Sequence, residues 1–315
     1  MSAKATPEKK TAVLRRLMKE EKLIVAPGVY DAYSARMTQA MGFKMAVTSG
    51  AGIANSHFGY PDLGIMTRTD NLEACRVLVR SLDIPLTADA DTGYGNAVSA
   101  YHTVQMFEDI GVCGVNMEDQ VFPKRCGHLK GKEIIPAIEM ARKVEAASKA
   151  RRDPDFLLVA RTDALAIEGI EGAIKRGKMY AEAGADMLFA DAVRTEEDIK
   201  RLVNEVPLPL TVNIGFGIRS RPTTPLIPIK RLTELGVKRV SVPRMLPAAA
   251  LMGMRQAFKV FQQAIESDVP VDRPDLTFTI DEITELMDYE KVFGLERQFL
   301  SEDELDNKYR ARSVV

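Results

Sequence analysis

Tryptophan is absent from this sequence of 315 residues, and cysteine and histidine each occur only three times. The cysteines, Cys75, Cys113 and Cys126, include no closely spaced pair, so the sequence indicates neither a disulfide framework nor a structural zinc site. An odd number of cysteines with this spacing fits a reducing compartment. We therefore expect a cytoplasmic protein.

An excess of one charge is lacking too, because 43 basic and 44 acidic residues leave a formal net charge of −1. Without a dense basic run there is no electrostatic case for binding nucleic acid. No apolar stretch reaches the about 18 residues that a membrane span needs. Residues 1–22 are polar and basic, without the apolar centre of a signal peptide. We expect neither nucleic acid nor a membrane as a partner.

The sequence does contain a repeating alternation of short β-branched runs and longer amphipathic segments. This alternation favours parallel strands joined by right-handed crossovers. Eight such units in about 250 residues fit a closed barrel better than an open sheet. The predicted fold is α/β, a (β/α)8 TIM-type barrel over residues 1–266. The predicted strands are residues 23–29, 44–50, 84–90, 113–119, 156–162, 185–191, 208–214 and 238–243.

A tail follows the eighth unit and lies outside the repeat. A long helix is predicted at about 247–266, and residues 267–315 form a Pro- and Asp-containing linker with an amphipathic helical segment at 281–299. An amphipathic helix must bury its apolar face. We expect the tail to pack either on its own barrel or on a neighbouring subunit.

Carboxylates gather where the predicted strands end. Asp89 and Asp91 end the third strand at a spacing that places both side chains on one side of it, and Glu118 ends the fourth. Asp62 lies in the loop after the second strand. Oxygen ligands that converge at the mouth of a barrel suit Mg²⁺, with Mn²⁺ as a substitute. The alternative is that these acids cap the following helices and pair with lysines.

The connection after the fourth strand runs from residue 119 to about 135 and combines Lys124, Arg125, Cys126 and His128. A thiol between cations has a lowered pKa and can act as a general acid or base. The alternative is a cysteine without a catalytic role in a solvent-exposed basic loop.

Other strand ends offer groups that bind carboxylates. Ser49, Gly50 and Ala51 follow the second strand and supply a hydroxyl and backbone N–H groups. Arg161 ends the fifth strand, where its guanidinium could hold a carboxylate through two bonds. Asn213 ends the seventh strand and could donate to an oxyanion.

The segments SGAG, GYPDLGI, ADADTGYGN, EDQVFPKRCGH, ARTDA and DYEKVFGLERQF cover nearly the whole chain in this order. Together they resemble the isocitrate lyase/phosphoenolpyruvate mutase superfamily, and KRCGH with DADTGYG is the most specific pair. The resemblance is greatest to short bacterial-type members, which include 2-methylisocitrate lyase, dimethylmalate lyase, oxaloacetate hydrolase and carboxyphosphonoenolpyruvate mutase.

This resemblance implies a metal site and a carboxylate site. Asp89 matches the principal Mg²⁺ ligand, and residues 49–51 with Arg161 match the groups that hold a 2-oxo acid. The residues that would support the ion directly or through water are Asp62, Asp91 and Glu118.

The resemblance also implies a mobile gating loop that contains Lys124, Cys126 and His128, with the cysteine as the general acid of the lyases. The mutases usually carry asparagine in place of Cys126, so the cysteine favours bond cleavage. Family members usually form tetramers in which dimers exchange the C-terminal helix. We therefore expect a homotetramer in which residues 267–315 take that role.

Three features depart from the family pattern. Asp191 stands where glutamate is common, and Val47 and Thr48 replace a tyrosine found before the SG segment. The segment VNIGFGIRSRPTTPL lacks the usual Thr-Glu pair after the seventh strand and carries Arg219 and Arg221. The half of the pocket that meets the leaving group is therefore unusual.

We predict a Mg²⁺-dependent carbon–carbon lyase that acts on a small 2-hydroxy di- or tricarboxylate of the 2-methylisocitrate or dimethylmalate type. It would release pyruvate or glyoxylate and a second carboxylate. The alternatives are an oxaloacetate hydrolase or decarboxylase, a phosphonomutase that uses Arg219 and Arg221, and a binding protein that has lost turnover.

Overall fold

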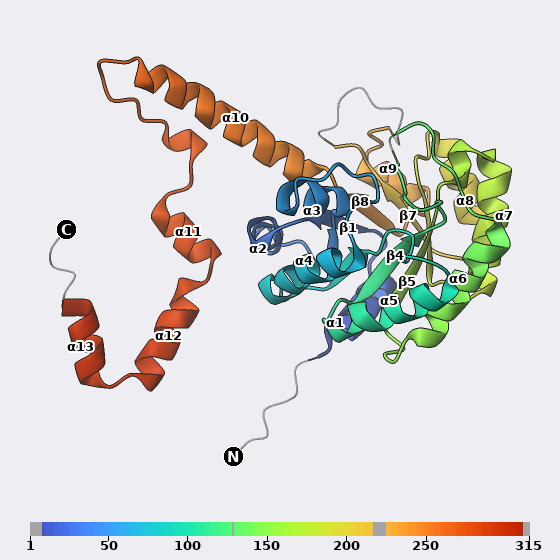
Figure 1. Cartoon of the computed structure of the whole chain (residues 1–315), viewed down its shortest axis with the longest axis horizontal. Helices are drawn as coiled ribbons and strands as arrows, with labels where there is room; N and C mark the ends of the chain where they lie inside the picture. The colour runs from blue at the N-terminus through green and yellow to red at the C-terminus, as the bar shows by residue number, and fades with distance from the viewer. Residues whose placement is uncertain (1–7, 128, 217–224, 311–315) are drawn as a thin grey trace. The chain divides into compact units, whose positions relative to one another are not determined.

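The computed structural model describes residues 8–127, 129–216 and 225–310. Eight parallel strands form a closed barrel in chain order, β1 to β8 (Figure 1). All eight predicted strands are confirmed, and the barrel confirms the predicted fold. The strands are β1 Ile24–Val29, β2 Ala46–Thr48, β3 Leu86–Asp89, β4 Gly114–Glu118, β5 Leu157–Thr162, β6 Met187–Ala190, β7 Leu210–Asn213 and β8 Arg239–Val242.

The barrel closes where β1 pairs with β8, with Ile24 opposite Arg239 and Pro27 opposite Val242. Close approach at this seam depends on Gly28, because a Cβ there would lie 2.4 Å from Pro243 Cα. Since all strands run in parallel, their carboxyl ends meet at one mouth of the barrel, where the connecting loops build the site.

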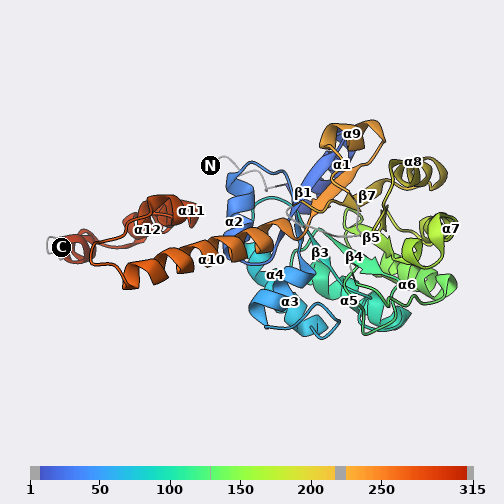
Figure 2. The ribbon, with the colours of Figure 1, turned by 90° about the horizontal axis from the view of Figure 1, so that it is seen from above.

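Helices cover the outside of the barrel (Figure 2). Apolar side chains from the strands and the inner helix faces form the core, including Phe107, Phe156 and Leu188. Gly111 and Gly184 end helices with φ of +86° and +99°, the left-handed conformation that suits glycine. The helices are α1 Lys10–Glu20, α2 Ala32–Ala40, α3 Gly50–His57, α4 Arg68–Ser81, α5 Ala97–Asp109, α6 Ala137–Ala150, α7 Gly169–Glu182, α8 Glu196–Glu205 and α9 Ile229–Glu234, with a 3₁₀ turn, η1, at Ala164–Ala166.

The chain divides into two compact units, Met1–Ala250 and Leu251–Val315. The division lies within the long helix after β8, α10 Met245–Ile265, rather than after residue 266. The 281–299 segment, expected to be a single helix, is two helices, because Asp288 between them adopts a left-handed conformation with φ of +58°. The tail elements are η2 Pro274–Leu276, α11 Ile280–Leu286, α12 Tyr289–Phe299 and α13 Glu302–Arg310.

No helix in the described part of the chain has the length and apolar character needed to pass through a lipid bilayer.

Candidate active site

A polar cavity of about 70 Å³ lies at the carboxyl ends of the strands. This volume is several times that needed for one water molecule, so the cavity can admit a small ligand. Residues from seven strand ends or their following loops contribute to its wall. The sequence-predicted residues among them are Ser49, Gly50, Ala51, Asp62, Asp89, Lys124, Cys126, Arg161, Asp191 and Asn213.

Helix α3 begins at the cavity wall. Ser49 is its N-cap, and the Ser49 hydroxyl accepts a hydrogen bond from the Gly52 backbone N–H at 3.1 Å. Gly50 lies close to the end of β3, because a Cβ there would lie 2.7 Å from Asp89 Oδ2. The first turn of α3 and the Asp89 carboxylate are therefore in direct apposition, with backbone N–H groups available for an anion.

Lys124 enters the acidic cluster predicted to hold a metal ion. Its Nζ lies 2.6 Å from Asp62 Oδ1 and 3.0 Å from Asp91 Oδ1. Burial alone would raise the pKa of Asp62, but Lys124 and Arg244 hold that pKa below its ordinary value. Burial raises the pKa of Asp91 to about 6 against the opposing effect of Lys124. A lysine ammonium thus supplies positive charge to the cluster.

Glu118 is the least satisfied carboxylate of the site. Arg161 Nη1 lies 3.1 Å from Glu118 Oε2, but neither Glu118 oxygen accepts a well-aligned hydrogen bond. Burial raises the pKa of Glu118 well above its ordinary value, with Arg161 opposing the shift. Buried acceptors without hydrogen bonds are rare in proteins and need an explanation.

These acids do not yet form a coordination shell. Within residues 8–127, 129–216 and 225–310, no group of three or more His, Cys, Asp or Glu side chains is arranged to hold a metal ion. The donor chemistry nevertheless fits Mg²⁺, because hard carboxylate oxygens are what this ion binds. The Glu118 oxygens and Asp91 Oδ1 are buried acceptors that lack hydrogen bonds. Cavity-lining oxygens are contributed by Asp62 and Asp89.

Arg161 is held by three carboxylates rather than left open for a ligand. Its Nε and Nη2 donate to the two oxygens of Asp163 at 2.9 and 3.1 Å, and Nη2 lies 3.4 Å from Asp191 Oδ2. Its guanidinium also lies over the Phe189 ring, 5.2 Å from the centroid. The predicted two-bond grip is therefore directed at Asp163, while Arg161 still forms part of the cavity wall.

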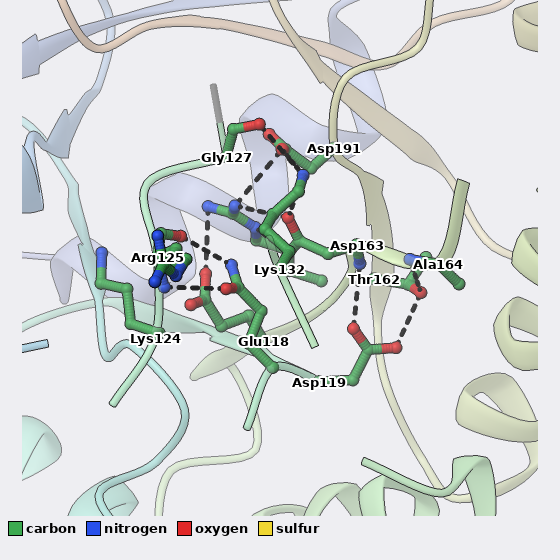
Figure 3. A network of polar contacts seen from close by, with 12 residues as sticks. Glu118, Asp119, Lys124, Arg125, Gly127, Lys132, Thr162, Asp163, Ala164 and Asp191 are labelled. Atoms are coloured by element: carbon green, nitrogen blue, oxygen red, sulfur yellow. Dashed lines mark hydrogen bonds and ion pairs between the residues drawn. The ribbon is translucent and has the colours of Figure 1, made fainter. Parts of the chain in front are cut away.

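The loop after β4 reaches into this network (Figure 3). Lys132 Nζ donates to Asp163 Oδ1 at 2.8 Å and to the Gly127 carbonyl at 3.0 Å, and lies 3.4 Å from Asp191 Oδ2. Gly127 packs so closely that a Cβ would lie 2.1 Å from Asp191 Oδ2. Lys132 therefore joins the loop to the strand ends. Sequence reasoning missed this residue, although it lies in the same cationic loop as Lys124.

Cys126 lies in the cavity wall next to a second residue that sequence reasoning missed. Arg244 Nη2 lies 3.1 Å from Cys126 Sγ and 3.2 Å from Asp62 Oδ2. The Cys126 backbone N–H donates to the Asp62 carbonyl at 3.2 Å, so this part of the loop is docked on the loop after β2. Arg244 follows β8, and an arginine at a strand end was the signal that could have identified it.

Behind the cavity, Asp119 ties β4 to α7 and β5. Its carboxylate accepts hydrogen bonds from Thr162 Oγ1 and the Tyr180 hydroxyl, both at 2.7 Å, and from the Asp163 N–H at 2.9 Å. Arg176 Nη1 lies 3.2 Å away. This buried network positions Asp163, the partner of Arg161.

Three predicted or discussed residues, His128, Arg219 and Arg221, lie outside the described residues. The structure brings the remaining candidates to one mouth of the barrel, with Asp91 and Glu118 beside the cavity-lining groups. Asn116, which lines the cavity below Glu118 on β4, was also missed by sequence reasoning.

The family described as "Phosphoenolpyruvate phosphomutase" matches residues 14–262. Among curated relatives, 2,3-dimethylmalate lyase of Eubacterium barkeri is 36% identical over 288 residues, which cover 91% of this chain and 97% of the relative. The 2-methylisocitrate lyase of Aeropyrum pernix is 37% identical over 288 residues, or 90% of each chain.

Solved structures of similar proteins have the same fold. Oxaloacetate acetylhydrolase in complex with 3,3-difluorooxalacetate superimposes with a TM-score of 0.83 at 30% identity, covering 92% of this chain and 97% of that one. Phosphonopyruvate hydrolase in complex with oxalate and Mg²⁺ superimposes with a TM-score of 0.80 at 27% identity, covering 93% and 100%.

Proposed function

This chain belongs to the phosphoenolpyruvate phosphomutase family and is an enzyme of the carbon–carbon lyase kind, and from this premise we propose that it is Mg²⁺-dependent. Its substrate would be a small 2-hydroxy di- or tricarboxylate of the dimethylmalate or 2-methylisocitrate type. The products would be pyruvate or glyoxylate and a second carboxylate. The observation that carries the proposal is the convergence of Cys126, Asp89 and Arg161 on one cavity.

The carboxylate of the 2-oxo acid half would lie against the first turn of α3. Backbone N–H groups at a helix N-terminus favour an anion there, and Gly50 lets the ligand and Asp89 approach closely. Arg161, fixed by Asp163, supplies a preorganised positive charge. Mg²⁺ held by Asp62, Asp89, Asp91 and Glu118 would stabilise the negative charge that develops in the reaction.

Cys126 would act as the general acid. A base of the site takes the substrate hydroxyl proton, and cleavage of the carbon–carbon bond then leaves a carbonyl on one fragment and a carbanion, in its enediolate form, on the other. That carbon takes the proton from Cys126 Sγ, which becomes a thiolate beside the Arg244 guanidinium at 3.1 Å. The docked loop, with Lys132 bound to Asp163, would exclude water while the carbanion exists.

A second candidate is hydrolysis of oxaloacetate. The solved structure of oxaloacetate acetylhydrolase, at 30% identity and a TM-score of 0.83, supports this candidate. This activity would yield acetate and oxalate rather than a 2-oxo acid.

The experiment is a screen for 2-oxo acid release from substituted malates, isocitrates and oxaloacetate, with Mg²⁺ and after chelation. Mg²⁺-dependent release of pyruvate or glyoxylate from one hydroxy acid, lost in Asp89→Ala, is the expected result. Acetate and oxalate from oxaloacetate would favour the hydrolase. Full turnover in the presence of chelator would overturn the metal assignment.

We further propose that the enzyme is a homotetramer in the cytoplasm. Apolar side chains along α10, including Leu251, Phe258 and Phe261, are exposed in the single chain. Burial of such a face against other copies would remove it from water.

A further inference from the structure

Arg239 places a cation in the interior of the barrel. Its side chain extends from β8 and is fully buried, with 0% of its surface exposed. Within the described residues it forms no ion pair with a carboxylate, and its guanidinium donates to neutral oxygens only. These are Thr211 Oγ1 at 3.0 Å from Nε, Thr87 Oγ1 at 3.3 Å from Nη1 and Asn116 Oδ1 at 3.2 Å from Nη2.

This placement disfavours folding. The interior of such barrels is usually filled by bulky branched apolar side chains. A buried guanidinium without an anionic partner loses hydration that neutral acceptors only partly replace. A residue that breaks a packing rule in this way points to a role in the nearby site.

The contact with Asn116 fixes which way the Asn116 amide faces. A guanidinium has five N–H donors and no acceptor, so the Asn116 atom that faces Arg239 must be the carbonyl oxygen Oδ1. The amide nitrogen Nδ2 is then left as a donor, and no described residue accepts a hydrogen bond from it. Asn116 lines the cavity and is opposite Asp89 in the strand register.

Arg239 remains positively charged at neutral pH, although burial lowers its pKa to about 10. It therefore keeps donating to Asn116 Oδ1 under working conditions. The Asn116 amide is thereby held in one orientation within the cavity wall that it shares with Asp89 and Gly50.

We propose that Arg239 is a positioning residue that holds the Asn116 amide so that Nδ2 donates a hydrogen bond to an anionic oxygen of the bound 2-oxo acid. Arg239 acts through Asn116 and does not touch the ligand. The pair selects ligands that present an acceptor oxygen at the floor of the cavity. This inference rests on the proposed function, because it assumes that the 2-oxo acid lies in this cavity.

The test measures the Kd of oxalate in the presence of Mg²⁺ by titration calorimetry, together with the Tm. The variants are Arg239→Met, Asn116→Leu and the double variant. Each single variant should weaken oxalate binding about tenfold or more, as loss of a hydrogen bond to a charged group does. The double variant should bind oxalate no more weakly than the single variant with the lower affinity, because both substitutions remove the same interaction.

The Tm separates positioning from a structural role. Arg239→Met replaces a buried cation with an apolar side chain of similar length, so its Tm should equal or exceed that of the wild type. A lower Tm with unchanged oxalate affinity would show that Arg239 is structural and overturn the inference. Additive losses in the double variant would also overturn it, because Arg239 would then act independently of Asn116.

Thr211→Val is the matched control, since it removes another acceptor of the same guanidinium but no cavity-lining group. It should bind oxalate as the wild type does. If it weakened oxalate binding as much as Arg239→Met does, the claim that Arg239 acts through Asn116 would be contradicted. If Arg239→Met fails to fold, wild-type affinity in Asn116→Leu still overturns the inference. Failure of the wild type itself to bind oxalate with Mg²⁺ would instead overturn the proposed function, and the inference with it.

Discussion

At the scale of single residues, the site depends on groups held in fixed places by their neighbours. Cys126 Sγ lies beside Arg244, and Arg161 is aligned by both oxygens of Asp163. The type and approximate place of Cys126, Asp89 and Arg161 could be predicted, because Asp89 and Arg161 lie at the ends of strands marked by apolar runs and Cys126 lies in the loop after such a strand. The position of Arg244 after β8 was a usable signal, but the contacts that give Arg244 and Lys132 their roles join loops distant in sequence and could not be predicted.

Cys126→Ser should lower kcat by about 10²–10⁴-fold, the contribution typical of a general acid. Serine keeps the size of the side chain, but its hydroxyl is a far weaker acid than a thiol. Oxalate and Mg²⁺ should still bind with wild-type affinity. Steady-state kinetics and calorimetry check both parts, and unchanged kcat would remove Cys126 from the reaction.

At the scale of elements, the long loop after β4 docks on the mouth of the barrel through Cys126 and Lys132. The eight strands and this long connection were predictable from apolar runs and their spacing. The break in the tail at Asp288 was not, because the amphipathic pattern continues through a residue whose backbone is left-handed. Likewise, sequence spacing could not show that Lys124 would lie among the acids predicted to bind the metal.

Gly127→Ala tests whether the docked position of the loop is needed for turnover. Its Cβ would lie 2.1 Å from Asp191 Oδ2 and 2.9 Å from Arg161 Nη2, so either the loop or these two side chains must move. We expect kcat to fall about 10²-fold, as a displacement of about 1 Å in a catalytic group can cause. Gly253→Ala in α10 is the control, because nothing lies within 4 Å of its added Cβ. Equal kcat values for the two variants would contradict a role for the docked loop.

Arg176→Met tests the network behind the site. It leaves the buried Asp119 carboxylate without its cation, 3.2 Å away. Breaking a buried pair in this way should lower the free energy of unfolding by about 3–5 kcal/mol. Urea unfolding measures the change. Arg201→Met, which removes surface ion pairs with Glu171 and Glu205, should have a much smaller effect, and similar losses in both variants would refute the assignment.

At the scale of the whole molecule, the tail presents an apolar surface that a single chain does not bury within its own compact unit. The molar mass measured by size-exclusion chromatography with light scattering should therefore be four times that of the 34.8 kDa chain. Phe258→Glu should reduce that mass, because a charge on the exposed face of α10 opposes its burial. Lys259→Glu on the same helix should not. A monomeric wild type would refute the tetramer.

Lys124 has a consequence for handling the enzyme without its ion. Its ammonium already balances Asp62 and Asp91 at 2.6 and 3.0 Å, so this part of the site has its own counter-charge before any ion arrives. Dialysis against a strong chelator should consequently leave the barrel folded, with its melting temperature nearly unchanged. Binding of Mg²⁺ then shares the carboxylates with the Lys124 ammonium, and its removal returns them to that ammonium. Enzyme prepared without metal should therefore regain full turnover when Mg²⁺ is added back.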